Sequence, residues 1–308
     1  MSLEQETFDL AIATDWIFDR DFVYLLKQEA SQRGLKTVVI NDENLENVIT
    51  SIREGSIKIS VLFDRAADTS VQFVGLQEVL KSRGTHIIDP VHKMQWASDK
   101  ATMHLEFINN GLFTPYTIII APYDASRDIL LSSEDLACLG RPFIIKPANT
   151  TGGGIGVVDG AESLHDVLTA RREYSADKYL LQEKVQPLVI EGKRFWFRGY
   201  YTLGLIQCAW WNDKTHIYSC LQPDHVKKYK LYPLFKIIKK IAHTCGLSFF
   251  STEISLTESQ KYVVVDYVNE SCDMRFQSNH ATGVPDSLIF NIVRRIARHT
   301  KKIVSNIS

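Results

Sequence analysis

The sequence has few cysteines and no pattern that would give them a structural role. Its five Cys residues are odd in number and scattered, with no C-x-x-C pair, which argues against a disulfide framework and against a zinc site. No apolar run approaches the ~18 residues that a membrane span requires, and the polar, acidic first residues do not resemble a signal peptide. We therefore expect a cytoplasmic protein without a membrane partner.

Positive charge is not in excess either. Lys plus Arg number 35 and Asp plus Glu number 36, for a net charge of −1, whereas a protein whose main partner is duplex DNA usually carries a clear basic excess. Nucleic acid is therefore disfavoured as a partner. Hydrophobic residues make up 45% and charged residues 23% of the chain, which excludes wholesale disorder. A length of 308 residues predicts about two domains, or one composite catalytic unit.

The N-terminal part alternates between strand-like and helix-like patterns. Strands are expected at Phe8–Ala13, Thr37–Ile40, Ile57–Phe63 and His86–Asp89, with helical segments between them. This alternation predicts βαβ units and a parallel sheet. The Gly-rich turn of a dinucleotide-binding unit is missing after the first strand, which continues Thr14-Asp15-Trp16-Ile17. We therefore assign no nucleotide to this domain.

The remaining chain is mixed. A helical stretch is expected over Val91–Gly111, and later helices over His225–Cys245 and Pro285–Val304. The segment Arg194–Trp211 is rich in aromatic and β-branched residues, which is typical of antiparallel strands.

The strongest local signal runs from Pro142 to Val157. A strand-like run ends at Lys146, and a Thr/Gly-rich loop follows before the next strand. Glycines in such numbers let backbone N–H groups approach an anion closely, and a lysine at the strand end could reach a phosphate oxygen. The loop is not a Walker motif, since no G-x-x-x-x-G-K-[ST] occurs in the chain. Taken alone, the pattern fits a Gly-rich hairpin with a structural lysine equally well.

Other segments whose residues could take part in binding or catalysis occur in a particular order around this loop. Lys100 lies upstream, in Ser98-Asp99-Lys100, and the apolar strand Tyr179–Val185 breaks into polar residues downstream. Near the end, Phe249–Ile254 and Val263–Glu270 are two strands that carry acids among hydrophobic residues. Such acids are costly to bury unless they are paired or bind a cation. Carboxylate and Asn oxygens are ligands that Mg²⁺ accepts together with nucleotide phosphates.

In this order and spacing, the sequence resembles the ATP-grasp superfamily from about Ser98 to Arg275, in particular its glutathione-synthetase-like and D-alanine–D-alanine-ligase-like members. The resemblance implies ATP and Mg²⁺ (or Mn²⁺) as cofactors. It implies phosphate contacts from Lys100 and Lys146, and an adenine hinge at Glu183, Lys184 and Val185. The loop closing over the phosphates would comprise Thr151, Gly152, Gly153, Gly154 and Gly156, and the metal ligands would be Glu253, Asp266 and Asn269.

Two departures from the family pattern stand out. The usual acid-x-Asn spacing places both metal ligands on one strand face, but here the spacing is Asp266-x-x-Asn269, which needs a bulge or a turn starting at Tyr267. Glu270 is therefore a rival ligand to Asn269. The ribose-binding acid expected after the hinge is also unclear, and Glu191 is the candidate because it is the only acid between Glu183 and the next strand.

Three arginines are candidates for catalytic contacts. Arg194 and Arg198 lie on one face of a predicted strand with Trp196 between them, where relatives contact a γ-phosphate or acyl-phosphate oxygen; the alternative is an exposed charged face. Arg275 follows the metal strand, and it would either hold a substrate carboxylate bidentately or pair with Asp273. His104, four residues after Lys100, is interpreted as a packed residue.

We accordingly predict an α/β protein with the ATP-grasp fold. It would comprise an N-terminal parallel βαβ domain (1–95), a small lid subdomain (96–182) and a larger antiparallel-sheet subdomain (183–308). The expected function is an ADP-forming ligase that joins a small-molecule carboxylate to an amine or other nucleophile through an acyl phosphate. An ATP-grasp kinase and a non-catalytic nucleotide-binding regulator are the alternatives. The sequence leaves open whether the chain forms a homodimer.

Overall fold

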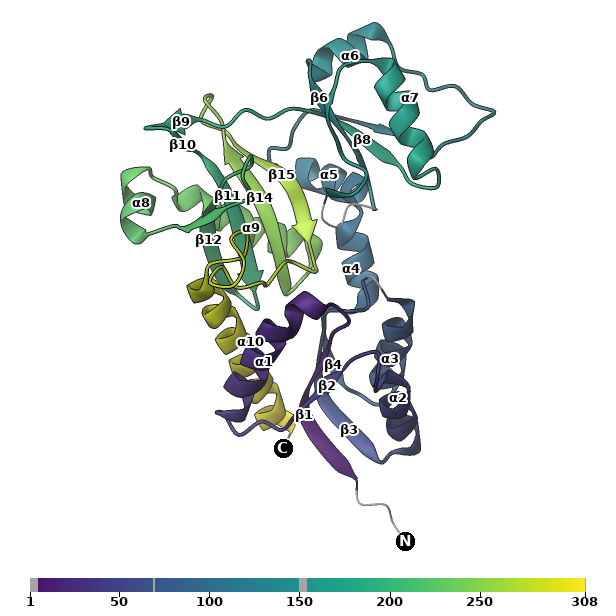
Figure 1. Ribbon diagram of the computed structural model, residues 1–308, viewed down its shortest axis with the longest axis vertical. Coiled ribbons are helices and arrows are strands. Elements are labelled where there is room, and N and C mark those ends of the chain that lie inside the picture. The colour runs from purple at the N-terminus through teal and green to yellow at the C-terminus, as the bar shows by residue number, and fades with distance from the viewer. Residues whose placement is uncertain (1–4, 69, 150–153, 308) are drawn as a thin grey trace.

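The chain folds around three main β-sheets that follow one another along its long axis (Figure 1). The computed structural model describes residues 5–68, 70–149 and 154–307. We call the sheets N-terminal, central and C-terminal after their order in the sequence, although in space the C-terminal sheet lies between the other two (Figure 1). This arrangement confirms the predicted α/β class, with one parallel sheet and two antiparallel ones.

The N-terminal sheet is parallel, with strand order β2-β1-β3-β4. Its elements are β1 (Glu6–Ala13), η1 (Ile17–Asp19), α1 (Arg20–Ser31), β2 (Thr37–Ile40), α2 (Leu45–Glu54), β3 (Ile57–Asp64), α3 (Val71–Ser82) and β4 (His86–Ile88). Side chains of β1 alternate between two cores: Leu10 and Ile12 pack with α1, whereas Ala11 and Ala13 pack with α2 and α3. Helices therefore cover both faces, as expected for a parallel sheet.

Two helices lead to the central sheet where the sequence predicted one helical stretch. They are α4 (Val91–Ser98) and α5 (Lys100–Asn109), and they are separated at Asp99. Asp99 has an extended backbone conformation, and its carboxylate accepts a hydrogen bond from the backbone N–H of Thr102. Because an N-cap residue of this kind begins a new helix, the chain turns here and Lys100 occupies the first turn of α5.

The central sheet is antiparallel, with strand order β5-β8-β6-β7. It consists of β5 (Thr117–Ile120), β6 (Phe143–Pro147), β7 (Val158–Ala161) and β8 (Tyr179–Glu183), with α6 (Ser133–Leu139) and α7 (Leu164–Glu173) packed against it. Lys146 lies near the end of β6, opposite Leu180 of β8.

The C-terminal sheet has the antiparallel order β13-β12-β11-β14-β15. Its strands are β11 (Trp196–Thr202), β12 (Leu205–Trp211), β13 (Tyr218–Cys220), β14 (Phe249–Leu256) and β15 (Tyr262–Asn269), preceded by the short hairpin β9 (Val189–Ile190) and β10 (Lys193–Arg194). The helical stretch predicted over 225–245 forms two helices, α8 (Pro223–Lys228) and α9 (Tyr232–Cys245), because Lys230 takes a left-handed conformation with φ of 53°. The helix α9 packs closely on β11 at Gly199, where a Cβ would lie 2.5 Å from Ile238 Cδ1.

The last helix, α10 (Asp286–Ile307), returns to the N-terminal sheet. It lies beside α1 (Figure 1), and its residues Ile289, Ile292 and Val293 share a core with Leu10 and Phe22. Both ends of the chain therefore contribute to one packing unit.

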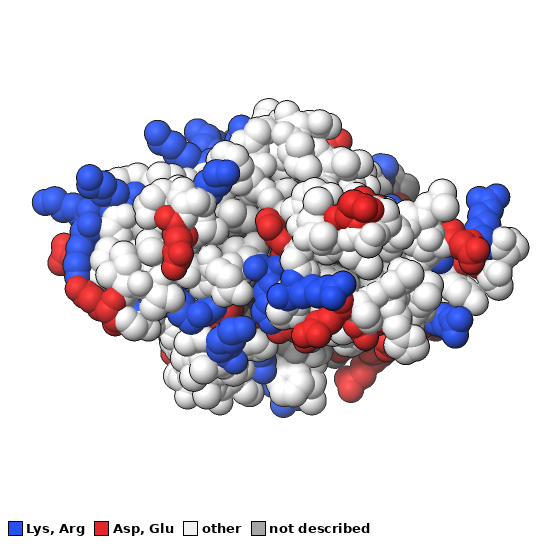
Figure 2. All heavy atoms as spheres, turned by 90° about the horizontal axis from the view of Figure 1, so that it is seen from above, with Lys and Arg blue, Asp and Glu red and all other residues white. Residues whose placement is uncertain are grey.

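The surface carries mixed charge where the central sheet faces the viewer. Lys and Arg side chains lie among Asp and Glu side chains on this face (Figure 2). No helix in the described part of the chain is both long and apolar enough to cross a membrane.

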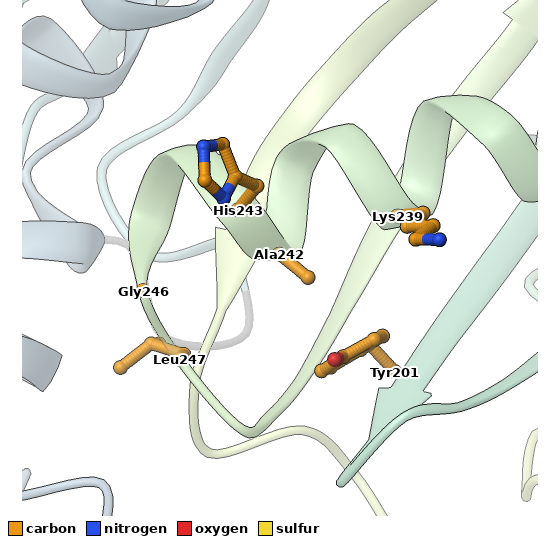
Figure 3. A pocket seen from close by; sticks show the side chains of 6 residues that line it. All are labelled: Tyr201, Lys239, Ala242, His243, Gly246 and Leu247. Carbon is orange, nitrogen blue, oxygen red and sulfur yellow. The ribbon is translucent and has the colours of Figure 1, made fainter.

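A hollow of about 560 Å³ lies between the C-terminal end of α9 and β11, lined in part by Tyr201, Lys239 and His243 (Figure 3). Its lining contains none of the residues that the sequence predicted for a site.

Candidate active site

Two acidic side chains meet across adjacent strands of the C-terminal sheet. Glu253 of β14 pairs directly with Asp266 of β15, and Ser251 pairs with Asn269. A step of two positions along β14 thus corresponds to a step of three positions along β15, which shifts the pairing register between these residues. The bulge predicted from the Asp266-x-x-Asn269 spacing is therefore present. In a regular strand, two side chains on the same face are two positions apart. The bulge accommodates the one additional residue between Asp266 and Asn269.

Arg198 links the two acids to the neighbouring strand. It is paired with Glu253 in the register of β11 and β14, and its Nη1 lies 2.9 Å from Glu253 Oε1 and 3.8 Å from Asp266 Oδ2. Trp196, two residues earlier on the same face, donates from Nε1 to Glu253 Oε2 at 3.0 Å. Glu253 is thus held from two positions of β11.

Burial and mutual repulsion shape the charges of this acid pair. Burial raises the pKa of Glu253, Arg198 opposes that shift and the nearby Asp266 adds to it. Burial also acts to raise the pKa of Asp266, but Lys100, Lys146 and Arg198 outweigh it and hold that pKa below its usual value. Asp266 is therefore ionised at neutral pH, and the pair carries negative charge that a cation would stabilise.

The donor set fits a magnesium ion held together with a nucleotide. No group of three or more His, Cys, Asp or Glu side chains in the described ranges is arranged to hold a metal by itself. Glu253 and Asp266 instead supply hard carboxylate oxygens from two adjacent, hydrogen-bonded strands, and Mg²⁺ is commonly bound by one or two carboxylates plus substrate phosphates.

Two lysines reach this pair from outside the C-terminal sheet. Lys146 is buried at the end of β6, and its Nζ donates to the carbonyl of Val265, next to Asp266, at 3.2 Å. The backbone N–H of Lys100 donates to Ala148 O at 3.2 Å, which brings the start of α5 beside the end of β6. Burial lowers the pKa of Lys146 to about 8, with a further lowering from Lys100 that Asp266 and Glu253 counteract.

A buried polar network supports Lys146 from behind. The Tyr267 ring lies 5.3 Å from Lys146 Nζ, and its hydroxyl lies 2.6 Å from His104 Nδ1 and 2.7 Å from Gln182 Nε2. Burial, together with the charge of Lys146, lowers the pKa of His104 to about 4, so this histidine is neutral at pH 7 and packed, as the sequence indicated. The roles of Tyr267 and Gln182 were missed, because no sequence spacing links residues on three separate elements.

The glycine-rich loop is only partly described. Thr151, Gly152 and Gly153 lie outside the described residues. Gly154 and Gly156 take left-handed conformations with φ of 81° and 73°. A Cβ at Gly156 would lie 2.5 Å from Cε2 of Tyr174, the residue that follows α7, so this position favours glycine both for its conformation and for its close approach to that ring.

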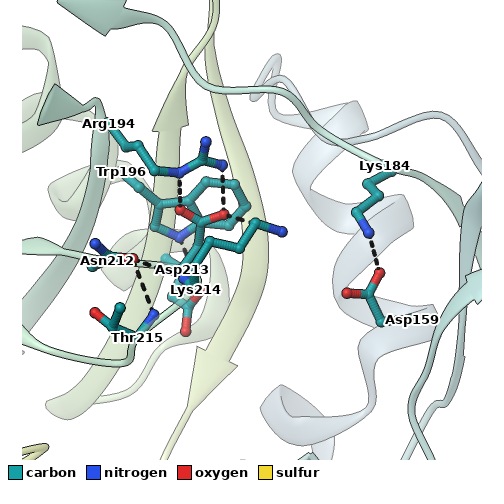
Figure 4. A network of polar contacts seen from close by, with 9 residues as sticks. Asp159, Lys184, Arg194, Trp196, Asn212, Asp213, Lys214 and Thr215 are labelled. Atoms are coloured by element: carbon teal, nitrogen blue, oxygen red, sulfur yellow. Dashed lines mark hydrogen bonds and ion pairs between the residues drawn. The ribbon is translucent and has the colours of Figure 1, made fainter. Parts of the chain in front are cut away.

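The predicted hinge lies where β8 ends. Glu183 Oε1 accepts a hydrogen bond from the backbone N–H of Tyr116 at 2.8 Å, and Lys184 Nζ lies 2.6 Å from Asp159 Oδ1 (Figure 4). Val185 follows directly in a half-buried position. Glu191, the candidate ribose ligand, lies in the exposed turn of the β9–β10 hairpin, 3.2 Å from Lys228 Nζ.

The other two predicted arginines have acidic partners of their own. Arg194 forms a bidentate pair with Asp213, at 2.5 Å and 2.7 Å (Figure 4). Arg275 forms the pair with Asp273 that the sequence left as an alternative, with Nη2 2.6 Å from Oδ2. Of the three arginines, Arg198 is the one that contacts the acid pair. Glu270, the rival metal ligand, is near enough for Asp266 and Asp68 to influence its pKa, which burial raises to about 7.

No sequence-family model matches the chain, and no curated protein sequence matches it. Solved structures do. A RimK-domain ATP-grasp protein from Sphaerobacter thermophilus superposes with a TM-score of 0.63 at 17% identity, covering 94% of this chain and 98% of that one. The D-alanine–D-alanine ligase of Bacillus anthracis, solved with ATP, gives 0.64 at 13% identity over 97% and 98%. The ATP-grasp ligase PsnB, solved with a precursor peptide and AMPPNP, gives 0.61 at 14% over 96% and 98%. The chain therefore has the ATP-grasp fold, as the sequence predicted.

Proposed function

We propose that the protein is an ADP-forming ligase that binds Mg·ATP between the central and C-terminal sheets and joins a carboxylate to an amine. The observation that carries this proposal is the convergence of Lys100 and Lys146 on the acid pair Glu253–Asp266. These four residues come from separate elements and bring together positive charge for phosphates and carboxylates for a divalent cation. The likeness to ATP-grasp ligases of known structure supports the same reading.

When bound, Mg·ATP supplies the γ-phosphoryl group, which passes to the substrate carboxylate to give an acyl phosphate and ADP, and the amine then displaces phosphate. Lys146 and Lys100 neutralise the phosphate oxygens, and Glu253 and Asp266 hold the metal. Positioning and charge neutralisation carry most of the rate enhancement in phosphoryl transfer, and no covalent nucleophile of the protein is required.

Arg198 is suited to the charge that develops during transfer. Its guanidinium is buried beside both acids, and Nη1 forms an ion pair with Glu253 Oε1 at 2.9 Å, although the angle of this contact does not meet hydrogen-bond geometry. Because Nη1 of a guanidinium carries two N–H groups, it can contact Glu253 and still donate to an oxygen of a ligand. We assign this atom to an oxygen of the transferring phosphoryl group. Arg194 and Arg275, held by Asp213 and Asp273, remain proposals for substrate contacts.

Mg·ATP is expected to stabilise the protein against heat. At a ligand concentration ~100-fold above Kd, binding to the native state alone contributes about 2.7 kcal/mol to the free energy of unfolding. We expect a melting shift of several degrees with Mg·ATP and a smaller one with ATP in EDTA. Magnesium without nucleotide serves as the control. No shift relative to the nucleotide-free protein at millimolar nucleotide, either with or without magnesium, would remove the nucleotide site from the proposal.

Hydroxylamine is expected to trap the reaction intermediate. An acyl phosphate reacts with hydroxylamine to give a hydroxamate, whereas the phosphate ester produced by a kinase does not. Pooled carboxylates are incubated with the protein, Mg·ATP and hydroxylamine, and the products are identified by mass. Hydroxamate that appears only with ATP supports the ligase. A stable phosphate ester without hydroxamate would identify a kinase instead.

A further inference from the structure

Unsatisfied polar atoms gather at the carboxyl edge of the N-terminal sheet, outside the nucleotide site. Thr14 Oγ1 follows β1, Asn41 Oδ1 follows β2, and Arg65 Nη1 and Asp68 Oδ1 follow β3; each is buried and has no hydrogen-bond partner among the described residues. Arg65 is only 4% exposed. Buried polar atoms are normally paired, so four such atoms at one edge point to a ligand.

The strand order gives an independent reason to expect a ligand at this edge. In open parallel sheets, ligands bind beyond the carboxyl ends of the strands, where the chain switches from one side of the sheet to the other. The order β2-β1-β3-β4 places that switch between β1 and β3. Thr14 and Arg65 are the first residues after these two strands.

The charge at this edge is negative. Arg65 is neutralised by Asp19, with Nε 2.5 Å from Oδ2 and Nη2 2.8 Å from Oδ1. Asp15 lies close enough to Asp64, and Asp64 close enough to Asp68, for the charge of the first to add to the raising of the second's pKa by burial. The Asp64 carboxylate is fully bonded, to Gln77 and two backbone N–H groups, whereas Asp68 has an oxygen to offer. A cationic group suits this edge better than an anion.

An apolar surface begins at the same strand end. Trp16, Ile17 and Phe18 are consecutive, follow Thr14-Asp15 directly, and are 42%, 68% and 48% exposed. We call these three residues the Trp16–Phe18 patch. The rings of Trp16 and Phe18 lie 5.3 Å apart, and the ring of His280 lies 6.0 Å from that of Phe18. Three adjacent large apolar side chains left in water indicate a binding surface.

The patch is connected to the acid pair by a chain of contacts. The guanidinium of Arg275 lies 6.0 Å from the Trp16 ring, and Tyr218 is close enough to influence the pKa of Arg275. The Tyr218 hydroxyl in turn lies 3.4 Å from Arg198 Nε, and Arg198 contacts Glu253. The patch is therefore linked to the site of the proposed chemistry through three intervening residues.

We propose that the amine substrate of this enzyme carries a large apolar or aromatic group, which packs on Trp16 and Phe18 while its ammonium group lies at the edge formed by Thr14 and Asp68. This inference rests on the proposed ligase function for the identity of the reaction. Trp16 and Phe18 are specificity-determining residues: they select the substrate by its apolar group and take no part in the chemical steps.

Calorimetric titration tests the inference with three probes, in the presence of Mg²⁺ and a non-hydrolysable ATP analogue. Phenethylamine has the ring and the positive charge, ethylamine lacks the ring, and 3-phenylpropionate has the ring with the opposite charge. We expect phenethylamine to bind at least about tenfold more tightly than either of the others, since aromatic contacts add to apolar burial. Equal binding of ethylamine, or tighter binding of 3-phenylpropionate, would overturn the proposal.

Variants locate the effect. Trp16→Ala and Phe18→Ala should each weaken phenethylamine binding by about tenfold and leave ethylamine unaffected. Tyr24→Ala is the matched control, because Tyr24 is an even more exposed aromatic residue (62%) of α1, and its hydroxyl accepts a hydrogen bond from Gln28 of the same helix. An equal loss in Tyr24→Ala would contradict the assignment. The ATP analogue is titrated separately: failure of that titration alone counts against the proposed function, and failure of ring selectivity alone counts against this inference.

Discussion

Replacing Asp266 with asparagine is expected to lower Mg·ATP turnover by at least about 100-fold while the protein remains folded. The side chain keeps its shape but loses the charge that faces Lys100, Lys146 and Arg198. The proposed metal site would lose one of its two carboxylates, and such electrostatic contributions to phosphoryl transfer are among the largest. ADP release measured at saturating nucleotide reports the effect.

The control lies on the same hairpin. Glu258 is exposed in the turn that joins β14 to β15, so Glu258→Gln removes a carboxylate from the hairpin without touching the acid pair and should leave ADP release unchanged. Asp266→Asn should also lose the part of the thermal shift that depends on magnesium. Turnover near the wild-type rate in Asp266→Asn would remove this residue from the metal site. Asn269→Ala and Glu270→Ala, compared in the same assay, decide which residue completes it.

Features that depend on local geometry could be predicted from the sequence. The parallel N-terminal sheet follows from strands and helices that alternate along the chain, and Thr37–Ile40 has the predicted bounds. The bulge in β15 could be anticipated because side chains of a strand repeat every two residues, so the spacing of Asp266 and Asn269 does not fit a regular strand. Helix interruptions at Asp99 and Lys230 were missed, since hydrophobic periodicity continues across them.

Ion-pair partners could not be predicted, because they depend on how separate segments meet. Spacing placed Arg194 and Arg198 on one face, but Asp213 is brought to Arg194 by the turn after β12, whereas Arg198 lies opposite Glu253 through strand pairing. The Tyr267 network likewise joins α5, β8 and β15. Individual site residues can therefore be predicted where they belong to a sequence motif. Which of their charges are already paired within the protein, and which remain available to a ligand, is seen only in the tertiary structure.

The protonated, charged form of Lys146 is less stable in the folded protein than that of a surface lysine, because Lys146 is buried. A pKa lowered from 10.5 to about 8 by burial corresponds to an unfavourable contribution of about 3 kcal/mol to the native state at neutral pH. Because the folded pKa lies below the unfolded one, the unfolded chain binds more protons between these two values. Stability from this group therefore rises with pH from about 8 to 10.5, and it is independent of pH below about 8, where the lysine is protonated in both the folded and the unfolded state.

Lys146→Met is expected to abolish turnover and yet leave the ligand-free protein at least as stable as the wild type at pH 7. The methionine side chain fills a similar volume without a buried charge, although the hydrogen bond to Val265 O is lost. Binding of ATP phosphates should raise the Lys146 pKa, so nucleotide binding by the wild type takes up protons near pH 8 to 9, which calorimetry detects as a dependence of the binding enthalpy on the buffer. Lys236→Met, at an exposed position of α9, is the matched control and should change neither turnover nor proton uptake. A ligand-free Lys146→Met protein that melts well below the wild type at pH 7 would show that this lysine serves the fold, because a residue retained for phosphate binding has no such stabilising effect.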